Sequence, residues 1–250
     1  MPFTFSHPAA ILPWLNRNKH FSSSGLIAGS LVPDFEGFIR MDLDGHFADT
    51  LPGVFLLDLP LAVLLLFVYH NLIREFLIAI LPKYFACRLA FGTHFKWINY
   101  FKSHWFIVLI SILTGIVTHL IWDDFTHYDG VVVNHFHGFF YQKIGTMSLF
   151  NVFQHGSSLI GAMTILTYFH KMPINASTKI PLAFQQQMWL KIIFYTLCFI
   201  LCRTYFGFDV FGEIIVSIIA CLLWSLVLVC LLYRTEFQKI KQKGFSNLVE

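Results

Sequence analysis

The sequence predicts an all-α, polytopic integral membrane protein, a helix bundle of about five long spans plus short re-entrant or interfacial helices at the N-terminus. Hydrophobic residues make up 56% of the 250 residues and charged residues only 12%, whereas about 25% charged residues is typical of soluble domains. Several segments reach the roughly 20 apolar residues that a helix needs to cross a bilayer. No internal repeat or soluble domain is evident, so we expect a single membrane-embedded domain over residues 1–250.

Five apolar segments carry the prediction of long spans. They are Leu51–Asn71, Trp105–Trp122, Ile144–Phe169, Met188–Tyr205 and Val210–Tyr233. Ahead of them, prolines divide the first 15 residues into pieces too short to span, and Gly25–Val32 is rich in small residues that favour close helix packing. The basic, amphipathic stretch Leu72–Lys102 is predicted to be an interfacial helix. Residues 1–170 then form a core that holds the polar site, and residues 171–250 add two spans and a basic tail.

The distribution of charge predicts the orientation and excludes one class of partner. Lysines and arginines gather in Leu72–Lys102, in Lys171–Lys179 and after Tyr233, which the positive-inside rule places in the cytoplasm. The loops at 34–50, 123–143 and 206–213 then lie on the non-cytoplasmic face, and the first two are rich in acids and histidines. The net charge of only +3 is spread over loops, so we expect no nucleic-acid partner. The oligomeric state is not predicted.

The polar end of the second span is the strongest functional signal. His119, Asp123 and His127 are spaced i, i+4 and i+8, which places them on one face of a helix. Imidazole and carboxylate groups suit zinc, iron or manganese, and ionisable groups at the end of an apolar helix carry a desolvation cost. The simpler interpretation is a polar helix end whose histidines have ordinary hydrogen-bond partners.

Further candidates fall on the same predicted face. The other candidate metal ligands are His7, Asp34 and His155. The candidate catalytic proton acceptors are Glu36, Asp49 and Asp124. His46 precedes the first span beside Asp49 and adds another polar group. This set exceeds what one zinc ion needs, so we expect one to three divalent ions, most readily zinc.

Several segments together resemble a known family. They read MPFTFSHPAAILP, GSLVPDFE, DTLPGVFLLDLPLA, THLIWDDFTH with VNHF, and QHGSSLIG. Over about residues 1–170 they resemble the uncharacterised bacterial membrane family designated domain of unknown function four-one-eight-four. That family is distantly similar to inner-membrane metal-dependent hydrolases and zinc-dependent phospholipase C. The resemblance implies His7, Asp34, His119 and Asp123 as ligands, with His127 and His155 as further ones. Glu36 and Asp49 stand where related sequences often carry Asp and His.

The resulting functional hypothesis is a metal-dependent hydrolase of the bacterial inner membrane. It would act on a phosphoester in a lipid or lipid-linked substrate, with water activated by the metal as the nucleophile. The alternatives are a non-enzymatic metal-binding membrane protein or divalent-metal transporter, and a di-iron lipid oxidase. A transporter favours polar groups near the bilayer midplane, whereas these candidates gather at one boundary. Di-iron oxidases of this kind carry several closely spaced histidine boxes, and here the histidines are isolated.

Overall fold

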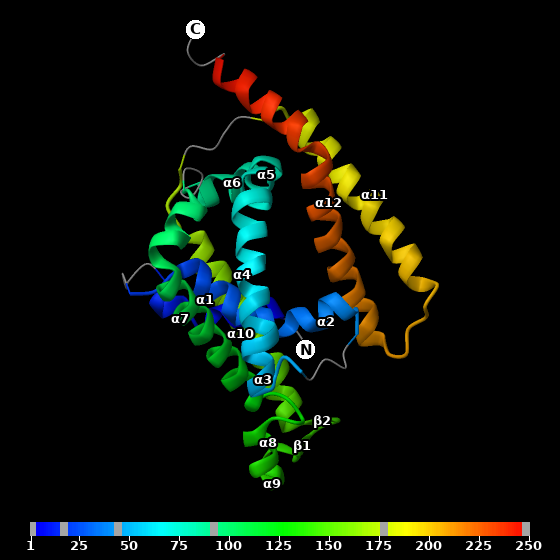
Figure 1. Cartoon of the computed structure of the whole chain (residues 1–250). Coiled ribbons are helices and arrows are strands. Elements are labelled where there is room, and N and C mark those ends of the chain that lie inside the picture. The colour runs from blue at the N-terminus through cyan, green and yellow to red at the C-terminus, as the bar shows by residue number, and fades with distance from the viewer. Residues whose placement is uncertain (1–3, 16–19, 43–46, 91–94, 176–179, 247–250) are drawn as a thin grey trace. The chain divides into compact units, whose positions relative to one another are not determined.

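The protein is almost entirely helical (Figure 1). The computed structural model describes residues 4–15, 20–42, 47–90, 95–175 and 180–246. Within these ranges the strands are two short ones, β1 (Lys143–Ile144) and β2 (Met147–Ser148), which pair antiparallel with Lys143 opposite Ser148. The predicted all-α class is therefore confirmed.

The first span is longer than predicted. It runs from Leu51 to Ile80 as α3 (Leu51–Gly53), the π-helical η4 (Val54–Asp58), α4 (Leu59–Val68), the π-helical η5 (Tyr69–Ile73) and α5 (Arg74–Ile80). Thr50 caps its start by accepting a hydrogen bond from the Gly53 amide. Residues 72–80 therefore belong to this span, and the predicted interfacial helix over Leu72–Lys102 is wrong. The short α6 (Lys83–Leu89) follows the span.

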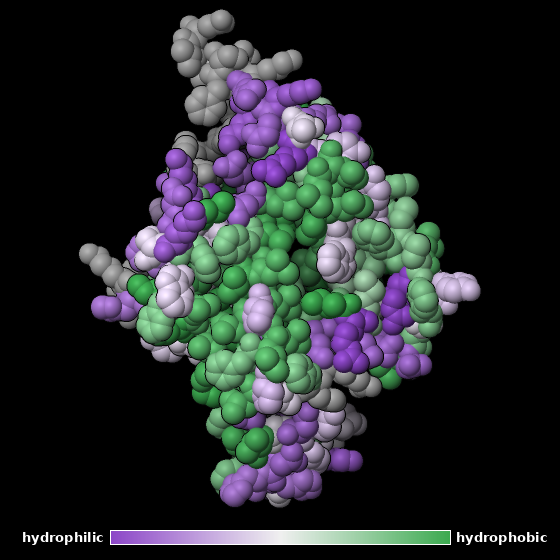
Figure 2. Space-filling model, in the orientation of Figure 1, coloured by the Kyte–Doolittle hydropathy of each residue, from purple (hydrophilic) through white to green (hydrophobic). Residues whose placement is uncertain are grey.

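The described ranges contain five long helices, and four of them agree with the predicted spans; a membrane crossing by Ile144–Phe169 stays a prediction. Besides Leu51–Ile80 the long helices are α7 (Trp97–Asp124), α10 (Leu149–His170), α11 (Leu182–Thr204) and α12 (Phe211–Ser246). All except α10 contain segments long and apolar enough to cross a membrane. Apolar side chains such as Leu56 and Leu201 are exposed along them, and a bilayer would cover these. Figure 2 shows apolar residues over α4 and hydrophilic ones around α8 (Val131–His135) and α9 (His137–Phe140). The chain is an integral membrane protein.

Short helices precede the first span, as the prolines predicted. They are η1 (Thr4–Ala9), η2 (Leu12–Trp14), α1 (Ser23–Leu31), η3 (Val32–Asp34) and α2 (Phe35–Arg40). Ser22 caps α1 by accepting a hydrogen bond from the Gly25 amide. The 3₁₀ helix η1 packs against both α1 and α10. The N-terminal segment thus joins the fold instead of spanning on its own.

The chain divides into two compact units that interleave in sequence. Unit 1 comprises Met1–Glu36, Gly45–Leu66 and Tyr100–Lys171, and unit 2 comprises Gly37–Asp44, Phe67–Asn99 and Met172–Glu250. Residues 37–44 and 67–99 group with the C-terminal helices, and the predicted division at residue 170 stays a prediction. That the units form one domain stays a prediction.

Within unit 1, small residues bring α1 into backbone contact with α7. A Cβ atom added at Gly29 would lie 2.0 Å from the Ile112 carbonyl oxygen, and one at Gly115 would lie 2.4 Å from that of Leu26. The Ser22 amide also donates to Ser111 Oγ at 2.8 Å. The expected close packing of Gly25–Val32 is confirmed, and it sets the position of the residues that follow α1.

Within unit 2, α11 and α12 form a helical hairpin on α5. Their core includes Phe76, Met188, Val229 and Phe237. The Trp189 indole donates to the Ile80 carbonyl at 2.9 Å. The end of the first span is thereby attached to the C-terminal helices.

Candidate metal centre

Five of the predicted side chains converge in unit 1. His7 comes from η1, Asp34 ends η3, His119 and Asp123 lie in the last turns of α7, and His127 follows that helix. One ligand atom each from His7, His119 and Asp123 lies within 4.8 Å of the other two. We call these five residues the His–Asp cluster. Segments separated by more than 100 residues therefore meet at one point.

Asp123 is the centre of the cluster, and both of its carboxylate oxygens face histidines. Its Oδ2 lies 3.2 Å from His119 Nε2, and its Oδ1 lies 3.6 Å from His7 Nε2 and 3.3 Å from His127 Nδ1. His119 Nε2 is also 3.6 Å from Asp34 Oδ1. The i, i+4 spacing predicted the contact of His119 with Asp123, because such residues stack on one helix face.

Several buried polar atoms of the cluster have no hydrogen-bond partner among the described residues. These atoms are His7 Nδ1, Asp34 Oδ2, His119 Nε2 and Asp123 Oδ1. His119 Nε2 and Asp123 Oδ2 are 3.2 Å apart, but they are not aligned as a hydrogen bond. Leaving such atoms buried without a partner costs about 1–3 kcal/mol each. A cation beside Asp123 would give His119 Nε2 and Asp123 Oδ1 a partner, whereas His7 and Asp34 face the cluster through their other atoms, Nε2 and Oδ1.

The orientation of His119 leaves one ring nitrogen available as a ligand. Its Nδ1 lies 2.9 Å from the backbone carbonyl oxygen of Ser30, which can only accept, so Nδ1 carries the proton. With a metal bound, Nε2 of the neutral ring would direct its lone pair toward Asp34 and Asp123. A carbonyl partner of this kind is the usual second contact of a metal-bound histidine.

His7 is held by aromatic packing. Its ring stacks on His119, with centroids 3.9 Å apart and planes inclined by 21°, and it also contacts Trp122. The Trp122 indole donates to Ser157 Oγ at 3.1 Å, which connects α7 to α10. The 3₁₀ helix that carries His7 therefore docks on a surface built by two long helices.

Burial shifts the pKa of His7 and of Asp34, two candidate ligands that lie outside the spans. Desolvation, reinforced by the neighbouring His119, lowers the pKa of His7 to about 3. Desolvation also raises the pKa of Asp34 above its usual value. His7 is therefore neutral at pH 7, which is the form that binds metals, and the Asp34 carboxylate lacks full charge compensation.

The donor set fits a divalent transition metal. Zinc bonds of about 2.0–2.2 Å in a tetrahedron separate the ligand atoms by about 3.3–3.6 Å. The four nitrogen–oxygen distances around Asp123 and His119 are 3.2–3.6 Å. Two histidines and two carboxylates are also a ligand combination that zinc, iron and manganese accept.

Asp124 and His155 lie outside the His–Asp cluster. Asp124 Oδ1 accepts the Val131 amide at 3.0 Å and thereby supports the turn before α8. His155 is exposed on α10, and within the described ranges no hydrogen bond or ion pair joins it to the cluster. His46 lies outside the described residues. Metal binding by His155 and a catalytic role for Asp124 stay predictions.

Glu36 and Asp49 are connected through one loop. Glu36 is buried, and its Oε2 accepts the Ala48 amide at 2.8 Å, which fixes the residue before Asp49. Asp49 as a whole is exposed, but its carboxyl group is partly desolvated. This desolvation, together with the charge of Asp123, raises the pKa of Asp49 to about 6. Asp49 is thus near enough to the cluster to sense its charge.

Sequence reasoning missed the Ser30 carbonyl, and it recognised Asp58 inside the first span without assigning it to the site. The Ser30 carbonyl orients His119, and a backbone atom leaves no signal in residue type. Asp58 lies fully buried in the π-helical η4, and neither of its oxygens has a hydrogen-bond partner among the described residues. A carboxylate inside an apolar span is a signal of function, and π-helical turns often accompany functional sites.

These features define a class: a helical membrane protein with a buried His–Asp cluster at the end of a span. The chain belongs to the family of the domain of unknown function DUF4184, whose family model matches residues 1–231. The match extends into α12, beyond residues 1–170, over which the motifs of the sequence resemble the family. The comparisons with curated proteins and with solved structures found no match.

Proposed function

We propose that this protein is a membrane-embedded, metal-dependent hydrolase that cleaves a phosphoester of a lipid or lipid-linked substrate. The convergence of His7, Asp34, His119 and Asp123 carries the proposal. A divalent cation, most readily zinc, would supply Lewis-acid polarisation of a phosphoryl oxygen and of the attacking water. The two oxygens of Asp123 face different histidines, so Asp123 would hold the cation together with His7 and His119.

The cluster is closed on one side and open on the other, which favours a reaction over a purely structural role. The side chains of His119 and Asp34 are 0% and 4% exposed, whereas those of Asp123 and His127 are 20% and 18% exposed. Catalytic zinc sites keep an open position, and structural sites do not. His127 lies on the open side, where it would complete the coordination or protonate the leaving oxygen.

Exposed apolar residues near Asp123 and Asp49 in the sequence would be compatible with an amphiphilic substrate. Ile121 and Phe125 flank Asp123 in sequence, Phe47 and Leu51 flank Asp49, and all four are exposed. Acyl chains would contact these apolar side chains while the phosphoester reaches the polar cluster. The basic loops favour a bacterial inner-membrane location with the cluster on the non-cytoplasmic face.

The purified full-length protein tests this proposal directly. Elemental analysis should find at least one divalent metal per chain, and vesicles of mixed phospholipids should release phosphorylated head groups unless a chelator is present. Metal flux into liposomes without hydrolysis would instead identify a transporter, and an iron absorbance band would favour the di-iron oxidase. A metal-free protein with no activity after zinc addition would refute the hydrolase.

The carboxyl group of Asp49 should set the pH dependence of the reaction. With a pKa of about 6, Asp49 is protonated in acid and becomes a base as the pH rises, so kcat should increase through about pH 6. Asp49→Asn should lower kcat by roughly 100-fold and abolish the rise of kcat through pH 6, the acidic limb of the pH profile. Asp129→Asn, which changes an exposed carboxylate in the same unit, should keep the limb. An unchanged pH profile in Asp49→Asn would assign the proton acceptor elsewhere.

A further inference from the structure

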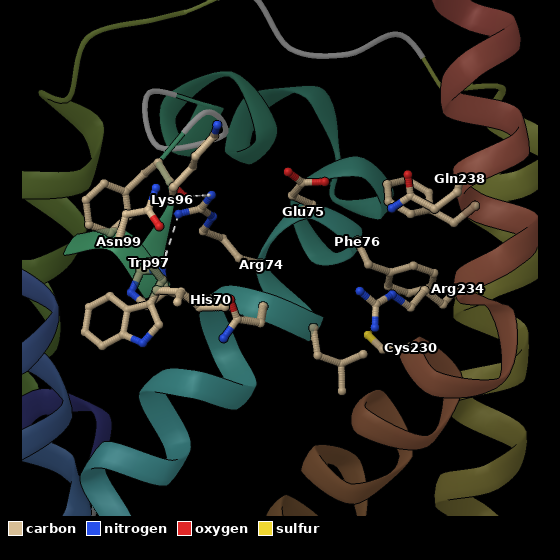
Figure 3. Close-up of a pocket in the computed structure, with 15 residues that line it drawn as sticks. His70, Arg74, Glu75, Phe76, Lys96, Trp97, Asn99, Cys230, Arg234 and Gln238 are labelled. Carbon is tan, nitrogen blue, oxygen red and sulfur yellow. Dashed lines mark hydrogen bonds between the residues drawn. The ribbon is translucent and has the colours of Figure 1, made fainter. Parts of the chain in front are cut away.

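Unit 2 contains a second polar cavity with a different chemistry. It has a volume of about 420 Å³ and lies between the end of the first span, the start of α7 and the C-terminal half of α12. Figure 3 shows side chains from all three segments directed into it. The cavity contains none of the His–Asp cluster residues, so an inference about it goes beyond the proposed function.

The lining of this cavity carries an excess of positive charge. Arg74, Lys96 and Arg234 line it, one from each segment. Among the described residues, Glu75 is the one carboxylate that lines it, and Glu75 Oε2 is already paired with Lys241 Nζ at 2.8 Å. A ligand entering the cavity therefore meets three cations and a carboxylate whose charge is largely compensated.

Arg74 is held in place by its neighbours. Arg74 is buried, its Nη2 donates to the Phe95 carbonyl at 3.0 Å, and its Nη1 lies 3.2 Å from His70 Nδ1. The His70 ring stacks on Trp97, with centroids 4.4 Å apart and planes inclined by 7°. Packing and hydrogen bonds thus fix the guanidinium in advance, which lowers the entropy lost when it binds a ligand. Lys96 and Arg234 are exposed and free to adjust.

The position of the cavity along the helices matches the head-group level of a bilayer. Arg234 follows the apolar run of α12, Trp97 begins α7, and Arg74 lies in the last turns of the first span. Tryptophan and basic residues gather at this level in membrane proteins. Clustered basic residues in such a position attract anionic lipids.

We infer that this cavity binds a phosphate-bearing anion, either an anionic phospholipid head group or free phosphate. Guanidinium groups form paired charge-assisted hydrogen bonds with phosphate oxygens. The side-chain amides of Asn99 and Gln238, which also line the cavity, add donors for head-group hydroxyls. The site recognises its ligand by net negative charge, so zwitterionic lipid is excluded.

Calorimetric titration of the full chain in detergent tests the inference. The ligands are short-chain phosphatidylglycerol, short-chain phosphatidylcholine and inorganic phosphate. Phosphatidylglycerol should bind, phosphatidylcholine should not, and the double variant K96Q/R234Q should weaken binding by roughly tenfold or more. Both side chains are exposed, so the fold should survive. The control K83Q/K239Q removes two exposed lysines of the same unit outside the cavity lining and should bind within about twofold of the wild type.

The outcomes separate the two sources of phosphate and the two proposals. Competition by inorganic phosphate would identify a phosphate site, and binding of phosphatidylglycerol without such competition would identify a head-group site. Equal binding by K96Q/R234Q and the wild type, or equal affinity for phosphatidylcholine, would overturn the inference. His119→Gln should bind phosphatidylglycerol normally, so failure of the metal site would leave this result intact.

Discussion

His119→Gln should lose its metal. Glutamine has a similar size but no ring nitrogen at Nε2, so one ligand disappears while Asp34 and Asp123 remain buried beside it. Loss of a residue that merely orients a ligand costs 10–100-fold in metal affinity, and loss of a ligand should cost more than about 100-fold. Elemental analysis after dialysis against a weak chelator measures the effect, and hydrolysis should fall in parallel.

His104→Ala provides the matched control. His104 lies on the same helix about four turns earlier and is exposed. This variant should keep the metal content and activity of the wild type. If His119→Gln retained full metal content, the cluster would instead be a network of histidine–aspartate ion pairs. A parallel thermal melt guards against simple unfolding, because a metal-free but folded His119→Gln is the expected product.

Gly29→Ala should have the largest effect on stability. The new Cβ would lie 2.0 Å from a backbone oxygen of α7, and a backbone atom cannot rotate away as a side chain can. Overpacking usually costs 1–3 kcal/mol, and this rigid clash should cost at least about 3 kcal/mol. Denaturation in mixed micelles, followed by circular dichroism, measures the loss.

The same substitution should also disturb the metal centre. Ser30, whose carbonyl orients His119, follows Gly29 directly, and Asp34 lies one turn further on. Moving α1 away from α7 would therefore displace two contacts of His119 together. Gly156→Ala is the control, since a Cβ on that helical glycine would meet nothing within 4 Å. It should leave stability within about 1 kcal/mol of the wild type. Comparable melting of the two variants would contradict the proposed packing.

The sequence by itself determined the class of fold and the half of the site on α7. Apolar length is a local property, so the composition sufficed to predict long spans. The spacing of His119, Asp123 and His127 likewise depends only on the helical repeat. The predicted first span, Leu51–Asn71, ends too early, since the helix continues through the charged residues Arg74 and Glu75 to Ile80. Their tertiary partners, the Phe95 carbonyl and Lys241, satisfy them and let the helix continue.

Only the tertiary structure decided which distant residues join His119, Asp123 and His127 in the candidate site. Among the described residues it brings His7 and Asp34 to Asp123 and His119 and leaves His155 exposed. The physical reason is that these contacts depend on how closely backbones approach, here through Gly29 and Gly115. The periodicity of a sequence reports which face of a helix is apolar. It does not report which neighbour packs there, nor that a backbone carbonyl will orient the ring of His119.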